Sequence, residues 1–172
     1  KESSAASDVY KRQDKKSRRS GKGEKRQVAA LPVRVDEDGN LLVLLITSRE
    51  TRRWVLPKGN LMKGKTPARA AAIEAIEEAG IVGKTIKKPY DSFQYWKRGK
   101  RAFAFAVVDV YLLIVAGRRP TWKEKGQRRQ VWVTPSQAAL MVLEPELQSL
   151  LQRLDADEAV ARQIRENIPE PA

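Results

Sequence analysis

Hydrophobic and polar positions follow a strand-like pattern over much of this chain. Val28 to Val35 and Leu41 to Thr47 are mostly apolar and flank the turn sequence DEDGN, so they predict a hairpin. Four further strands are expected, over residues 54–56, 85–97, 101–115 and 130–133. A turn is predicted at residues 98–100 and a basic loop at 117–126.

One helix is signalled at both ends. Thr66 can act as its N-cap, Pro67 fits the first helical position, and Gly80 fits the stop after Ala79. Within it, the spacing predicts that Ile73 and Ile76 face the core.

Two more helices are predicted towards the C-terminus. Recurring leucines after Thr134 and Pro135 indicate a helix that Pro145 interrupts early, and residues 155–167 form a further candidate. Strands mixed with helices predict an α/β fold with a mixed sheet and helices on its faces. We expect a basic arm over residues 1–25, one domain over 26–154 and a helical extension over 155–172.

The amino-acid composition excludes several classes of catalytic and metal-binding site. The 172 residues include no Cys and no His, which excludes disulfides, thiol nucleophiles, Ser-His-Asp catalysis and Cys- or His-ligated metals. Carboxylates, Lys, Tyr and an oxygen-bound cation remain. No apolar run approaches the roughly 20 residues of a spanning helix, so we expect a cytoplasmic protein without a membrane partner.

The net charge of +13 favours polyanionic partners. About half of the excess lies in residues 1–26, which hold ten Lys or Arg and four Asp or Glu. This arm is interpreted as a solubilising tail, with contact to nucleic acid or another partner as the alternative. The sequence leaves the oligomeric state open.

Three carboxylates gather at the end of the predicted helix. Glu74, Glu77 and Glu78 lie on one helical face, where their charges repel one another unless a cation sits between them. Carboxylate oxygens are natural ligands of Mg²⁺. The loop Pro57-Lys58-Gly59 precedes the helix, so a loop carbonyl and helix carboxylates can share one metal. A solvated acidic face is the alternative interpretation.

The segment from Gly59 to Ile81 resembles the Nudix box, whose pattern is G-x5-E-x7-R-E-U-x-E-E-x-G-U with U aliphatic. Gly59, the three glutamates, Gly80 and Ile81 match it. Lys65 replaces the early glutamate, Ile73 replaces the arginine, and Ala75 takes the aliphatic position. The resemblance implies the Nudix α/β/α sandwich and hydrolysis of a diphosphate bond by water with Mg²⁺, or Mn²⁺ in its place.

Within this family the chain is similar to the diphosphoinositol polyphosphate phosphohydrolases, which also cleave dinucleoside polyphosphates. The similarity covers residues 26–143. It rests on the box and on four flanking motifs: VAALPVR, TSRETRRWVLPKG, KRAFAF and GQRRQVWV. The expected substrate is therefore a highly phosphorylated small molecule.

Roles follow from spacing and charge. Glu74 and Glu78 superimpose on the helix and are assigned to the metal together with the Gly59 carbonyl. Glu77 lies one residue off and is predicted to be the general base, with a third metal ligand as its alternative role. Basic residues are predicted to hold the phosphates: Arg49, Arg53, Lys58, Lys63, Lys65, Arg101, Arg128 and Arg129.

Three interpretations of function remain. The first is hydrolysis of inositol pyrophosphates or dinucleoside polyphosphates. The second is an RNA 5′-end or nucleotide pyrophosphohydrolase. The third is a weakly active module that binds nucleotide or RNA, because Ile73 removes a cation that would orient the glutamates and Lys65 reverses a charge. Lys65 is alternatively a phosphate contact. Tyr95, Trp96 and Trp122 are candidates for stacking on a base or for packing.

Overall fold

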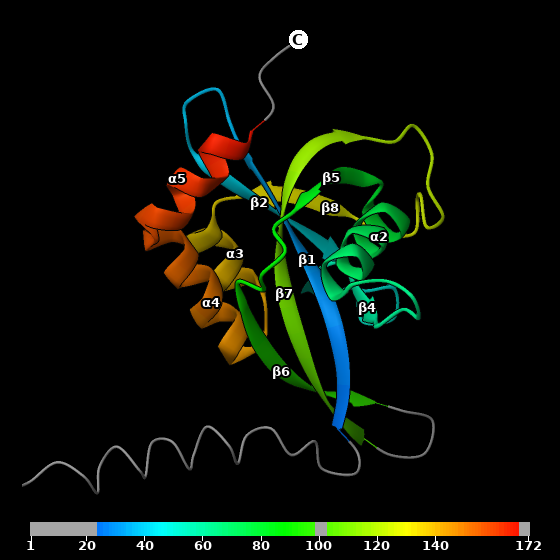
Figure 1. Ribbon diagram of the computed structural model, residues 1–172. Helices are drawn as coiled ribbons and strands as arrows, with labels where there is room; N and C mark the ends of the chain where they lie inside the picture. The colour runs from blue at the N-terminus through cyan, green and yellow to red at the C-terminus, as the bar shows by residue number, and fades with distance from the viewer. Residues whose placement is uncertain (1–23, 99–102, 169–172) are drawn as a thin grey trace, which may run out of the picture.

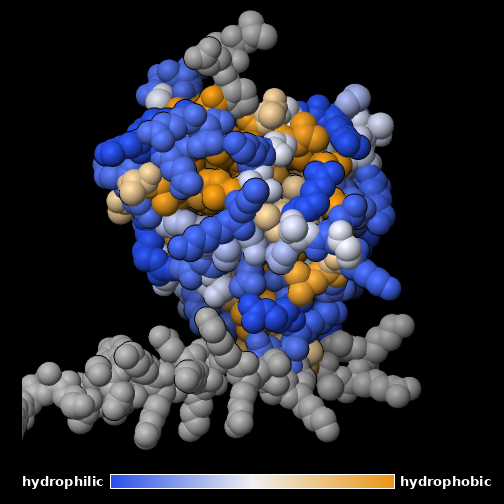
Figure 2. Space-filling model, viewed as in Figure 1, coloured by the Kyte–Doolittle hydropathy of each residue, from blue (hydrophilic) through white to orange (hydrophobic). Residues whose placement is uncertain are grey.

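A computed structural model describes residues 24–98 and 103–168 of the chain. The predicted turn at 98–100 falls largely outside this range, and so does Arg101. No helix in the described part of the chain is long and apolar enough to cross a bilayer. The surface seen in Figure 2 is mostly hydrophilic, with apolar side chains in separate patches.

An eight-stranded sheet forms the centre of the molecule (Figure 1). Its main path runs β3-β2-β1-β7-β5, while β4 pairs with β1, β6 with β7 and β8 with β2. The strands are β1 (Glu24–Val35), β2 (Leu41–Thr47), β3 (Trp54–Val55), β4 (Lys58–Asn60), β5 (Ile81–Thr85), β6 (Asp91–Arg98), β7 (Phe103–Arg118) and β8 (Gln130–Val133).

The two long strands make the sheet mixed, as expected. β1 and β7 run parallel from Glu24 opposite Phe105 to Val33 opposite Ile114, whereas the other pairs are antiparallel. Each long strand also pairs with two further strands along its length. β1 pairs β4 near its start and β2 near its end, and β7 pairs first β6 and then β5.

Helices cover both faces of this sheet, which gives the expected α/β/α sandwich (Figure 1). Helix α2 (Pro67–Ala79) lies on one face. Helices α3 (Pro135–Met141), α4 (Pro145–Ala156) and α5 (Glu158–Asn167) lie on the other. Side chains of β1 alternate between the two cores, with Val28 and Ala30 towards α2 and Ala29 and Leu31 towards α4.

The caps of α2 are those the sequence predicts, but its buried face is not. Thr66 accepts a hydrogen bond from the Arg69 N–H, and Gly80 ends the helix in the left-handed conformation at φ 72°. The buried residues are alanines: Ala68, Ala70, Ala71, Ala72, Ala75 and Ala79. Ile73 and Ile76 are only half-buried, so the prediction that they face the core was wrong. Small side chains are what this close helix–sheet contact accepts.

The predicted strand over residues 85–97 was also wrong. Two strands stand there, because β5 begins at Ile81 directly after the helix stop and β6 begins only at Asp91. Both pair with the long strand β7, at its two ends. The C-terminal helices follow the prediction, since the first ends before Pro145 and α4 starts at that proline.

Candidate functional site

Strand β4 brings Gly59 against helix α2. A Cβ atom at this position would lie 2.0 Å from Glu74 Oε1, so only glycine allows the carboxylate to press against the backbone here. One residue earlier, the Lys58 N–H donates to Glu78 Oε2 at 3.4 Å. Glu74 and Glu78 therefore both meet the Gly59 segment, as their shared helical face predicts.

Burial sets the electrostatics of these two carboxyl groups. The Glu78 side chain is 13% exposed. Burial raises its pKa to about 7, against the opposing charges of Arg128 and Lys58. Burial likewise raises the pKa of Glu74, with Glu77 and Glu124 adding repulsion. Burial, rather than repulsion between carboxylates, is thus the main cause of both raised pKa values.

We call the carboxylates of Glu74, Glu77 and Glu78 on α2 the acidic centre. A fourth carboxylate, Glu124, reaches it from the loop after β7. Its Oε2 accepts from Arg128 Nε at 2.8 Å, and its Oε1 lies 3.2 Å from Arg49 Nη1. Arg128 also contacts Glu78 Oε1 at 3.2 Å. Glu124 is not among the predicted site residues, because residues 117–126 were interpreted only as a basic loop.

Hydrogen bonds fasten this loop to the C-terminal end of α2. The Glu124 N–H donates to the Glu77 carbonyl at 3.0 Å, and the Arg119 N–H donates to the Gly80 carbonyl at 2.8 Å. The Gln130 side chain donates to the Ala79 carbonyl at 3.0 Å. The loop thereby satisfies helix carbonyls that lack partners within the helix. The position of Glu124 is fixed by the same contacts.

Glu77, the predicted general base, lies at the edge of the acidic centre. Its side chain is 38% exposed and its Oε2 lies 3.3 Å from Lys123 Nζ. Exposure to solvent leaves this carboxylate open to a water molecule, which a base requires. Its role stays a prediction.

An open cleft of about 980 Å³ lies beside Glu78. Four of the predicted phosphate-binding residues line it: Arg49, Arg53, Lys58 and Arg128. Lys97 and Arg98, which the sequence analysis had not selected, line it as well. Six basic side chains around one cleft make it suitable for a polyanion.

Two of these cations, Arg53 and Lys58, contact other side chains of the protein. Arg53 Nη1 lies 2.8 Å from Glu144 Oε1, a buried carboxylate at the start of α4. The Lys58 ammonium lies 5.4 Å from the ring centre of Tyr95, and burial lowers its pKa, opposed by Glu78 and Glu144. These contacts fix the direction of both side chains towards the cleft.

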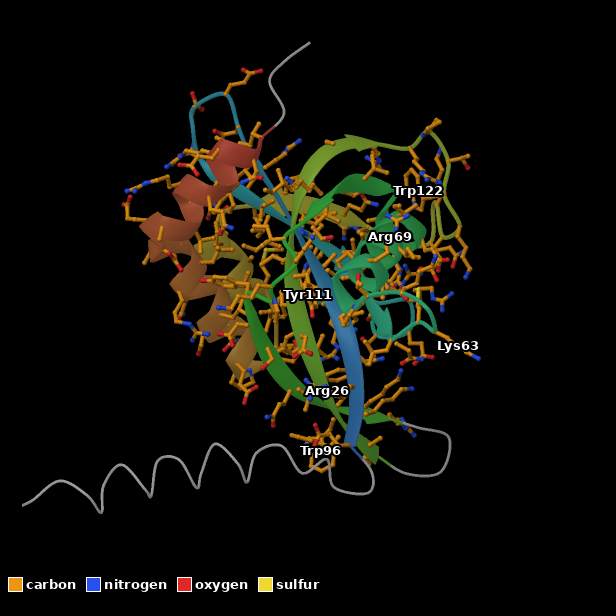
Figure 3. All side chains as sticks on the ribbon, in the orientation of Figure 1. Arg26, Lys63, Arg69, Trp96, Tyr111 and Trp122 are labelled. Carbon is orange, nitrogen blue, oxygen red and sulfur yellow. The ribbon has the colours of Figure 1, made fainter. Side chains whose placement is uncertain are left out.

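Other predicted residues stand away from the cleft. Lys63 and Lys65 are exposed in the loop before α2, and Lys63 extends outwards in Figure 3. Arg129 is exposed and stacks over Trp54, with its guanidinium carbon 5.9 Å from the ring centre. Arg101 lies outside the described residues. The structure thus brings together half of the predicted phosphate-binding set.

The three candidate stacking residues also separate. The Tyr95 hydroxyl and Gln27 Oε1 form a hydrogen bond of 2.5 Å, and the Trp122 ring packs on Gly80. Trp96 lines the cleft and is 67% exposed, although its ring contacts that of Phe105 (Figure 3). Tyr95 and Trp122 are thus held by packing, and Trp96 is the exposed one of the three.

The acidic centre fits a divalent cation in its chemistry. Glu74, Glu78 and the Gly59 carbonyl offer hard oxygen donors of the kind that Mg²⁺ prefers. Burial disfavours the ionised form of both glutamates, and a bound cation would stabilise that form. Within residues 24–98 and 103–168, no group of three or more acidic side chains lies close enough together to hold a metal ion.

Comparison with known proteins adds to this geometry. The model of the NUDIX domain matches residues 25–154. Nudix hydrolase 18, mitochondrial, of Arabidopsis thaliana is 25% identical over 136 residues, which cover 76% of each chain. Diphosphoinositol polyphosphate phosphohydrolase 2 of Rattus norvegicus is 30% identical over 111 residues, covering 63% of this chain and 58% of the relative. Several relatives are thus matched over less than two thirds of their length, at 58–61%.

Solved structures show the same fold. An Ap4A hydrolase of C. elegans superimposes with a TM-score of 0.58 at 20% identity, covering 77% of this chain and 96% of the other. The NUDIX domain of Shewanella oneidensis NrtR, solved with ADP ribose, gives a TM-score of 0.58 at 15% identity, covering 81% and 91%. At these identities the likeness concerns the fold.

Proposed function

The chain belongs to the Nudix family, and we propose on that basis that it is a Mg²⁺-dependent hydrolase that cleaves a diphosphate bond in a highly phosphorylated anion. Diphosphoinositol polyphosphates and dinucleoside polyphosphates are the proposed substrates. The Nudix hydrolases among its relatives support a pyrophosphohydrolase, and the similarity to the rat phosphohydrolase supports this choice of substrate.

One observation carries the proposal: the cleft brings one carboxylate of the acidic centre together with a set of cations. Glu78 lines the same cavity as Arg49, Arg53 and Lys58. A polyphosphate chain held by these cations would place one of its diphosphate bonds beside the carboxylates of α2. Each charge-assisted contact is worth about 1.5–3 kcal/mol, so several together favour substrates with many charges.

In the proposed mechanism the residues divide the work. Glu74, Glu78 and the Gly59 carbonyl would hold Mg²⁺, which neutralises phosphate charge and lowers the pKa of bound water. Arg49, Arg53 and Lys58 orient the phosphates, and arginine does so with paired hydrogen bonds. Glu77 takes the proton from the attacking water, because its side chain is 38% exposed whereas that of Glu78 is 13% exposed.

The test is a substrate panel with the full chain. We expect kcat/KM for a diphosphoinositol polyphosphate or a long dinucleoside polyphosphate to exceed that for ADP-ribose by at least about tenfold, in Mg²⁺ and in Mn²⁺, as the charge argument requires. Triphosphorylated RNA tests the second interpretation. Equal efficiency on ADP-ribose, a higher efficiency on RNA, or no turnover of any substrate would contradict the proposal.

A further inference from the structure

Arg128 directs its guanidinium into the protein rather than into solvent. Its side chain is 8% exposed, and its three nitrogens have three separate partners. Nε donates to Glu124, Nη2 pairs with Glu78, and Nη1 donates to the Thr47 carbonyl at 3.0 Å. One side chain therefore joins α2, the loop after β7 and the end of β2.

We propose that Arg128 is a positioning residue, which holds the Glu78 and Glu124 carboxylates in place and so supplies a cation that helix α2 itself lacks. Arg69 is the sole basic residue of α2, and it is exposed near the helix start. The position directly before Glu74 is occupied by Ile73, which cannot pair with a carboxylate. This inference rests on the proposed function of the site.

The chemistry of arginine suits this position. Its planar fork remains charged when buried and can satisfy several acceptors in fixed directions. Lysine could offer the charge but not the three separated directions. The backbone on either side is also held, because the Arg129 N–H donates to Thr47 Oγ1 at 2.9 Å and the Thr47 N–H donates to the Arg129 carbonyl at 3.0 Å. The guanidinium therefore approaches Glu78 from a fixed point.

The same contacts argue against a phosphate-binding role for Arg128. Each of its three nitrogens already faces a carboxylate or a carbonyl, which leaves only two of its five N–H groups for a substrate phosphate. A positioning residue acts on the chemical step, whereas a phosphate contact acts mainly on binding. A cation that merely blocked the acidic centre would slow the enzyme, and its removal would raise turnover.

The experiment compares Arg128→Ala and Arg128→Lys with Lys125→Ala in the full chain. Lys125 lies in the same loop, but its ammonium contacts the Pro120 carbonyl and the Trp122 ring instead of a carboxylate. We expect Arg128→Ala to lower kcat at least about tenfold with KM changed less than about threefold. Arg128→Lys should fall between it and the wild type, and Lys125→Ala should keep the wild-type kcat.

A crystal structure of the Arg128 variant supplies a readout independent of activity. We expect the Glu78 side chain to leave its contact with the Lys58 N–H in Arg128→Ala. Should Arg128→Ala fail to fold, Arg128→Lys is measured in the same two ways. A raised KM at unchanged kcat, a raised kcat, or an unmoved Glu78 would overturn the inference. A wild type that cleaves no diphosphate defeats the proposed function instead, and the crystal structure still decides the role of Arg128.

Discussion

The two faces of the sheet are packed by different means. Towards α3, α4 and α5 the core contains large side chains, among them Leu147, Leu150, Leu151 and Leu154 of α4, all at most 1% exposed. Towards α2 the helix contributes alanines. Large apolar side chains bury more surface, so the leucine face contributes more to stability. The alanine face instead brings the helix backbone close to the strands.

The difference explains why the site lies where it does. Glu74 reaches the Gly59 backbone because α2 packs closely against the sheet. A helix held away by leucines would leave the carboxylates further from β4. We infer that one face supplies most of the stability and the other supplies the geometry of the site, and substitutions on the two faces should separate these contributions.

The largest expected effect is on the leucine face. Leu150 is 0% exposed, so Leu150→Ala should lower the free energy of unfolding by about 2–5 kcal/mol. Turnover per folded molecule should stay within about twofold of the wild type. The cavity that the substitution leaves lies on the far side of the sheet from α2. Urea denaturation measures the free energy of unfolding, and rates normalised to the folded fraction measure turnover per folded molecule. A tenfold loss of turnover in the folded fraction would contradict the division between faces.

The second effect concerns pH and Glu78. Because burial raises its pKa from 4.5 to about 7, the folded form binds a proton in this window that the unfolded form has lost. Wild-type stability should therefore fall as pH rises from 4.5 to 7 and then level off. The full shift corresponds to about 3–4 kcal/mol, at 1.36 kcal/mol per pKa unit.

The side chain of the Glu78→Gln variant cannot ionise at this position. The variant should therefore lack the fall in stability that Glu78 causes as pH rises from 4.5 to 7. Without metal, it should therefore be more stable than the wild type at pH 8 and similar at pH 4.5. The exposed Glu37→Gln serves as the matched control and should follow the wild type. Parallel stability curves for Glu78→Gln and the wild type would show that Glu78 is not buried as described.

The smallest effect on stability is expected on the alanine face. Ala75 is 0% exposed, so Ala75→Leu should cost about 1–3 kcal/mol through overpacking. In contrast to Leu150→Ala, it should also lower turnover per folded molecule, because it displaces the helix next to Glu74. Normalised rates of the two variants, measured side by side, test this contrast. Wild-type turnover in folded Ala75→Leu would remove the link between close packing and the site.

Local signals were enough to predict much of the fold. Thr66, Pro67 and Gly80 gave the bounds of α2, because caps act within a few residues of the chain. Short, mostly apolar segments likewise predicted β2 and β8 at their observed bounds. The facing of Ile73 was missed because periodicity finds apolar positions but not how closely a helix approaches its sheet.

The remaining parts of the site depend on contacts between distant segments. Glu124 and Arg128 lie about 50 residues beyond Glu78 in the chain, and only the fastening of their loop to α2 brings them together. Arg128 was selected as a phosphate contact because it belongs to a basic motif. In the structure its guanidinium contacts Glu78, Glu124 and the Thr47 carbonyl, which charge counting along the sequence could not identify.

The most direct test of the central claim is the turnover of Glu78→Gln with Mg²⁺, on the best substrate of the panel. The substitution keeps the shape of the side chain and removes one charge from the acidic centre. Turnover should fall at least about a hundredfold, given the several kcal/mol that a metal ion contributes to such reactions, in a protein that remains folded. Wild-type turnover in folded Glu78→Gln would contradict the assignment of the site to the carboxylates of α2.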